Sequence, residues 1–169
     1  MTQKEKQERF IQLYSGVKDN IWRYCLFMAK NREFAKDLLG ETLASAYEGF
    51  NSLSNEKAFL SFLFTISSRI YYKLKRKKDS ARFVNVELDS LFVQNLSADI
   101  ITDISLLYEC LNKLPEEQKE ALILHNIEGF SRKEVAEIQK VSEETVKSRL
   151  ALGKKKLSQL MGIDDEERA

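Results

Sequence analysis

A helix-turn-helix pattern over residues 129–157 constrains the fold of this chain more than any other feature. Ser131 predicts the N-cap of a short helix over 132–139, and Ser142 predicts the N-cap of a second helix over 143–160. Apolar residues stand where the two helices have to lock together: Val135, Ala136, Ile138, Val141, Val146 and Leu150. The N-terminal part of the second helix, which in such motifs enters the major groove of duplex DNA, stays polar. Its candidate contacts are Thr145, Lys147, Ser148 and Arg149.

The composition is that of a mainly helical protein with one or two small domains. The 169 residues include only one proline and six glycines, which argues against long loops. The formal net charge of +1 hides an uneven distribution. Residues 1–82 hold 16 Lys and Arg against 9 Asp and Glu, residues 83–106 have a net charge of −4, and residues 107–169 have a net charge of −2. This asymmetry indicates two modules joined by an acidic connector.

Several classes of protein are excluded by what the chain lacks. No stretch approaches the roughly 18 apolar residues of a membrane span, and the polar start differs from a signal peptide. Cys25 and Cys110 have no metal-ligand spacing and are interpreted as reduced thiols. We interpret His125 as a packing or surface residue, and Asp37 and Glu41, one helical turn apart, as solvated carboxylates. We therefore expect a cytoplasmic protein that is not an enzyme, with no catalytic residues, no metal site and no cofactor.

Apolar periodicity predicts that the first 78 residues form one domain. Stripes over 5–31 and 33–50, followed by a helix over 56–78, predict a compact three-helix bundle. Residues 51–55 predict a polar loop between the last two helices.

The rest of the chain predicts a second helical domain. Residues 79–103 have no clean period and predict a linker, although their apolar residues indicate that it packs against a module or a partner. Helices over 104–114 and 116–127 precede the helix-turn-helix, so residues 104–161 predict a four-helix domain, followed by an acidic tail over 162–169. The predicted fold is all-α, with two small helical domains.

The helix over 56–78 carries a second nucleic-acid signal, because it is aromatic at first and basic at its end. Rings stack on exposed bases and cations hold phosphates, so this combination is typical of single-strand binding. We interpret Phe59, Phe62 and Ile66 as bundle core, and the basic run over 75–78 as phosphate contacts rather than a solvated helix end. The basic residues are Arg69, Lys73, Lys75, Arg76, Lys77, Lys78 and Arg82.

A duplex reader and a candidate single-strand binder in one chain resemble the extracytoplasmic-function (ECF) type of bacterial sigma factor. The resemblance covers roughly residues 8–160. Residues 111–150 look like the family's region 4, with a leucine–proline opening, a glycine before the first helix of the motif and a threonine-valine-lysine-serine-arginine recognition helix. Residues 35–50 and 62–78 are similar, more loosely, to the two helices of region 2 that meet the polymerase clamp and the promoter's -10 element.

The resemblance implies a role for each matching residue. The protein would bind core RNA polymerase through its clamp helices and flap, recognise promoter DNA, help to melt the -10 element, and be open to inhibition by an anti-sigma factor. Clamp contacts would be made by Asp37, Leu38 and Glu41. Contacts to the -10 element would be made by Asn51, Ser52, Asn55, Arg69, Lys73, Lys75 and Arg76. Contacts to the -35 element would be made by Thr145, Lys147, Ser148 and Arg149, with Lys154 on a flanking phosphate.

Some positions depart from the family pattern. Gly40 replaces a glutamine that contacts the clamp, Lys140 replaces a frequent turn glycine, and Leu152 replaces an arginine that reaches DNA in many members. Two other interpretations therefore stay open: a helix-turn-helix transcription regulator without polymerase-directing activity, and a sigma-like interaction module without promoter activity.

Overall fold

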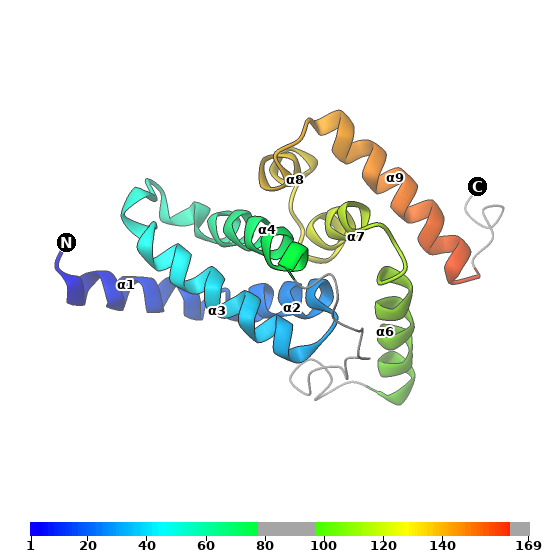
Figure 1. Ribbon diagram of the computed structural model, residues 1–169, viewed down its shortest axis with the longest axis horizontal. Helices are drawn as coiled ribbons and strands as arrows, with labels where there is room; N and C mark the ends of the chain where they lie inside the picture. Colours follow the sequence, from blue (N-terminus) through cyan, green and yellow to red (C-terminus); the bar gives the residue numbers. More distant parts are fainter. Residues whose placement is uncertain (78–96, 163–169) are drawn as a thin grey trace. The chain divides into compact units, whose positions relative to one another are not determined.

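The computed structural model describes residues 1–77 and 97–162, and every regular element in these two ranges is helical (Figure 1). The chain divides into two compact units. We call them the N-terminal unit, which contains α1 to α4, and the C-terminal unit, which contains α6 to α9. No helix in the described ranges is both long and apolar enough to cross a membrane.

Within residues 1–77 the N-terminal unit has four α-helices where the periodicity predicts three. They are α1 (Gln3–Ser15), α2 (Lys18–Ala29), α3 (Arg32–Glu48) and α4 (Phe59–Lys77). The apolar stripe over 5–31 is correct, but the helix is interrupted at Gly16. The backbone N–H of Gly16 donates to the Leu13 carbonyl, and that of Val17 donates to the Tyr14 carbonyl. Glycine has a low helix propensity, so this is where the long stripe divides into α1 and α2.

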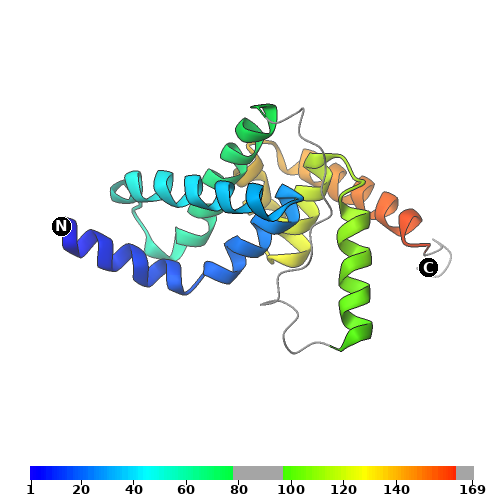
Figure 2. The same ribbon diagram turned by 60° about the horizontal axis from the view of Figure 1, so that its bottom comes forward.

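The core of the N-terminal unit lies between α2, α3 and α4 (Figures 1 and 2). On α3 the buried residues recur every three or four positions, as the sequence predicts, and on α4 they form a matching stripe. The Tyr24 and Phe64 rings meet edge-on, with centroids 5.0 Å apart. Cys25 in α2 is free and buried, and burial raises the pKa of its thiol to about 12. The thiol therefore stays protonated at neutral pH, which suits a core residue rather than a nucleophile.

Gly40 lies exposed in the middle of α3, and a Cβ built there meets nothing within 4 Å. We therefore expect Gly40→Ala to stabilise the N-terminal unit by about 1 kcal/mol, because alanine restricts the unfolded chain and favours the helix. The measurement is urea unfolding followed by the fluorescence of Trp22, the single tryptophan, which lies in α2. The control is Ala44→Gly, one turn along the same exposed face, which should destabilise by a similar amount. Equal midpoints for Gly40→Ala and the native chain would contradict the prediction.

The C-terminal unit consists of α6 (Ala98–Leu111), α7 (Glu116–Leu122), a π-helical turn η3 (Ile123–Ile127), α8 (Arg132–Gln139) and α9 (Glu143–Leu160). Within residues 97–162 four α-helices are therefore present, as predicted, and α7 packs on α9.

The first helix of the C-terminal unit begins earlier than the sequence predicts. It was expected over 104–114, but Ser97 caps it by accepting a hydrogen bond from the backbone N–H of Ile100. The last residues of the predicted linker over 79–103 are therefore helical. Two predictions concern residues outside the described ranges. One is the packing of the linker's apolar residues, which lie within 78–96, and the other is the acidic tail, of which residues 163–169 are not described.

Candidate nucleic-acid interface

The helix-turn-helix is capped as the sequence predicts. Ser131 accepts a hydrogen bond from the backbone N–H of Glu134 at 3.1 Å, and the Glu134 carboxylate accepts one in return from the Ser131 N–H at 3.0 Å. Ser142 accepts from the backbone N–H of Thr145 at 3.1 Å and so caps α9. The two caps fix where α8 and α9 begin, and Figure 1 shows the short turn between them.

The turn between α8 and α9 requires a left-handed residue. Lys140 has φ 58° and ψ 45°, and the backbone N–H of Val141 donates to the Ala136 carbonyl at 3.0 Å. Glycine adopts this conformation without steric cost, whereas a side chain does not, which explains the frequent glycine at this position.

We expect Lys140→Gly to stabilise the C-terminal unit by roughly 1 kcal/mol, because it relieves the left-handed strain. Hydrogen exchange of the α8 and α9 backbone amides in the full chain measures the change. Lys140→Ala is the matched control, since it removes the same charge but keeps a Cβ in the left-handed conformation. Similar protection in both variants would show that charge, and not backbone strain, is responsible.

His125 holds the segment that enters α8. Its Nδ1 lies 2.8 Å from the Phe130 carbonyl oxygen; because that oxygen can only accept, Nδ1 carries the hydrogen. The backbone N–H of Phe130 donates to the Leu124 carbonyl at 3.0 Å, and Gly129 between them has φ +82°. The predicted packing role of the single histidine is thus to fix the approach to the motif.

The exposed face of α9 carries most of the predicted duplex contacts. Lys147, Ser148 and Lys154 are exposed, whereas Arg149 is half-buried. Thr145 is also half-buried, and its hydroxyl lies 3.0 Å from the Ser142 hydroxyl, so it takes part in the cap.

The opposite face of α9 is buried and includes Gly153. A Cβ at Gly153 would lie 3.0 Å from Cδ1 of Leu122, closer than ordinary packing permits. The glycine therefore lets α9 approach α7 closely, which sets the position of α9 on the unit.

A continuous basic face runs along α4 in the N-terminal unit. Arg69, Lys73 and Arg76 follow one another at helical spacing and are exposed, as is Lys77, and Lys75 is half-buried. The Arg76 Nε donates to the Tyr72 carbonyl at 3.3 Å. Lys78 and Arg82 lie outside the described residues.

The aromatic half of α4 differs in part from expectation. Phe59 is 2% exposed and belongs to the core, as predicted. Phe62 and Ile66 were also interpreted as core, but both are only half-buried. They precede Arg69 at the same helical spacing and therefore extend the basic face with apolar surface.

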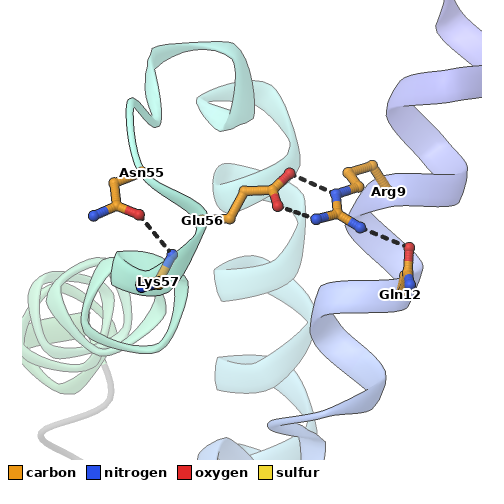
Figure 3. A network of polar contacts seen from close by, with 5 residues as sticks. All are labelled: Arg9, Gln12, Asn55, Glu56 and Lys57. Atoms are coloured by element: carbon orange, nitrogen blue, oxygen red, sulfur yellow. Dashed lines mark hydrogen bonds and ion pairs between the residues drawn. The ribbon is translucent and has the colours of Figure 1, made fainter.

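Three long-range contacts from α1 hold the loop before α4, and none of them is visible in the sequence. The ring of Phe10 meets the rings of Phe50 and Phe59 edge-on, each at 5.5 Å between centroids. Arg9 pairs with Glu56 and also donates to Gln12 (Figure 3). These hydrogen bonds from Arg9 lower the pKa of the Glu56 carboxyl.

The anchored loop presents three of the predicted -10 contacts. Asn51, Ser52 and Asn55 are all exposed. The Asn55 side chain accepts from the backbone N–H of Lys57 at 3.0 Å (Figure 3), and the Ser52 hydroxyl donates to the Gly49 carbonyl at 2.6 Å. Both side chains therefore also define the loop's shape.

The predicted clamp contacts on α3 divide into two kinds. Asp37 and Glu41 are exposed one turn apart, with Gly40 beside them. Leu38 was predicted on this surface, but its side chain is 0% exposed and fills the core of the unit. Leu38 is therefore corrected from a contact residue to one that supports the helix.

Comparison with known proteins identifies the family. The family model described as "Sigma-70, region 4" matches residues 104–157. The ECF RNA polymerase sigma factor EcfG of Rhodopseudomonas palustris (strain TIE-1) is 30% identical over 148 residues, which cover 85% of this chain and 80% of that protein. This chain belongs to the ECF sigma factors. A second relative, the ECF RNA polymerase sigma factor SigM of Bacillus subtilis (strain 168), is 26% identical over 160 residues, which cover 92% of this chain and 98% of that protein.

Solved structures agree with this family. The sigma factor RpoE from Bartonella quintana, solved in complex with the anti-sigma factor NepR, is 27% identical with a TM-score of 0.79, covering 93% of this chain and 99% of that one. CnrH, solved in complex with the cytosolic domain of CnrY, has a TM-score of 0.69 at 20% identity and supports the fold. A sigma factor role in transcription initiation follows from the family, and a helix-turn-helix regulator of another class is not favoured.

Proposed function

We propose that this sigma factor binds core RNA polymerase and directs it to promoters with separate -35 and -10 elements, acting by binding alone and in the cytoplasm. The observation that carries the proposal is the presence, in one chain of this family, of a capped helix-turn-helix and a second, basic helix face on α4. A protein that only binds duplex DNA needs the helix-turn-helix alone, whereas a protein that also melts a promoter needs a second surface for the separated strand.

In this proposal α9 reads the -35 element in the major groove. Lys147 and Ser148 are exposed near its N-terminal end, where a recognition helix meets base edges, and Arg149 lies beside them. Thr145 combines its capping role with the same surface. Lys154, exposed two turns further along α9, contacts a flanking phosphate.

The N-terminal unit binds the -10 element. The anchored loop with Asn51, Ser52 and Asn55 receives an unstacked base, and Arg69, Lys73, Lys75 and Arg76 follow the phosphates of the separated strand. The half-buried ring of Phe62 supports this assignment, since it gives the basic face an aromatic surface next to the loop.

Contacts to the polymerase are assigned to exposed groups of both units. Asp37 and Glu41 on α3 meet the clamp helices, and the C-terminal unit meets the flap. The solved complex of the similar RpoE with an anti-sigma factor supports a further partner, an inhibitor that covers these surfaces when the protein is inactive.

The test is run-off transcription with bacterial core polymerase on a library of genomic promoters, with and without the protein. Transcripts that depend on the protein and share a two-part promoter support the proposal and give its specificity. Core binding without transcripts would mean that the free chain is inhibited or has lost promoter activity. Neither core binding nor transcripts would overturn the proposal.

A further inference from the structure

Leu152 is a large apolar side chain on the face of α9 that carries the candidate duplex contacts. Its side chain is 56% exposed, the highest value among the large apolar residues described in the C-terminal unit. Ala151 beside it is also exposed. The buried residues of α9 are Val146, Leu150, Gly153 and Ser158, so Leu152 lies outside the core of the unit.

The neighbours of Leu152 indicate the kind of partner it meets. Residues three and four positions away are neighbours on a helix surface, and for Leu152 these are Ser148, Arg149, Lys155 and Lys156. Ser148, Lys155 and Lys156 are exposed, and Arg149 is half-buried. An apolar side chain enclosed by three cations and a hydroxyl suits a polyanion that offers an apolar group among its charges, rather than the apolar groove of a protein.

Duplex DNA offers such a group in the C5-methyl of thymine, which lies in the major groove. Leu152 follows Ser148 by one helical turn, about 6 Å along the axis, whereas the groove is about 12 Å wide. A helix that brings Lys147 and Ser148 to base edges therefore brings Leu152 into the same groove.

We propose that Leu152 is a specificity-determining residue that contacts a thymine methyl in the -35 element, an inference that rests on the proposed function. An arginine at this position would donate hydrogen bonds to guanine instead. The leucine thus changes the preferred base from guanine to thymine at one position, without adding a hydrogen bond. The cations around it hold the helix on the phosphates while the side chain excludes water from the methyl group.

The experiment removes one methyl group at a time. The full-length protein is titrated with -35 duplexes taken from the run-off promoters, and each thymine in either strand is replaced in turn by deoxyuridine, which lacks only the methyl. We expect one position at which deoxyuridine weakens binding about fourfold, because a buried methyl contributes about 0.8 kcal/mol. Leu152→Ala should bind thymine and deoxyuridine equally at that position, and Leu152→Arg should prefer guanine there. Gln159→Ala, exposed further along α9, is the control that should keep the methyl effect.

The outcomes separate this inference from the proposed function. A native chain that prefers the -35 duplex but tolerates deoxyuridine everywhere would overturn the methyl contact alone. A methyl effect that persists in Leu152→Ala would also overturn it. A chain without any preference among duplexes would overturn both. Because Leu152 is exposed, circular dichroism of the variants should match that of the native chain.

Discussion

Replacing Lys147 and Arg149 together by alanine is expected to weaken binding to the -35 duplex by a few kcal/mol, about 100-fold, at roughly 1–3 kcal/mol for each base contact. The physical reason is that Lys147 and Arg149 lie in the second turn of α9, close to the Ser142 cap, where a recognition helix meets base edges, and alanine cannot donate to a base edge. Alanine keeps the helix intact, so the loss reports on recognition rather than on folding.

The measurement is fluorescence anisotropy with a -35 duplex and a scrambled duplex at one salt concentration, since affinity for DNA depends steeply on salt. The control is Lys154→Ala with Lys155→Ala, which removes the same charge from exposed positions further along α9. We expect this control to weaken both duplexes equally, because phosphate contacts carry no sequence information. An unchanged preference in the Lys147 and Arg149 variant would remove the assignment of α9 as the recognition helix.

Local signals in the sequence predicted the parts of the site that are formed locally. Ser131 and Ser142 were expected as caps and are caps, because an N-cap needs only a side-chain oxygen and the next three residues. The resemblance marked Lys140 as standing at a frequent turn glycine, and the structure shows why glycine is frequent there, since this residue has φ 58°.

Two of the errors concern residues at which another local signal in the sequence already favoured the observed structure. The apolar stripe over 5–31 continues through Gly16, so periodicity alone cannot show that the helix is interrupted there. Leu38 was placed on the surface by resemblance to a motif, although its spacing from Phe34 and Thr42 puts it on the buried face of α3.

Some contacts that support the candidate site left no local signal in the sequence. The pairing of Arg9 with Glu56 joins residues 47 positions apart, and the ring of Phe50 is fixed by α1 and α4 together. These contacts shape the loop with Asn51 and Asn55. The sequence therefore predicted the loop's side chains but not the long-range contacts that hold the loop in place.

Replacing Lys75, Arg76 and Lys77 together by alanine is expected to weaken open-complex formation and to flatten its dependence on salt. For single-stranded DNA, log affinity falls against log salt with a slope of about −0.7 for each phosphate contact, so three lost contacts should reduce the slope by about 2. The structure supports this expectation because Arg76 and Lys77 are exposed and continue the face of Arg69 and Lys73. The measurement is the fraction of open promoter complexes over a series of salt concentrations.

A matched variant distinguishes phosphate contacts from the general effect of charge. Lys4, Lys18 and Arg32 are exposed elsewhere in the N-terminal unit, and their replacement by alanine removes the same charge. Cations in the last turn of α4 also stabilise the helix end through its dipole, but that effect is small and makes no contribution to the slope. If the basic run binds the separated strand, only its own variant flattens the salt dependence. If both variants showed the same salt dependence of open-complex formation, the basic run over 75–77 would be a solvated helix end. Arg69 and Lys73 would then be the strand contacts of α4.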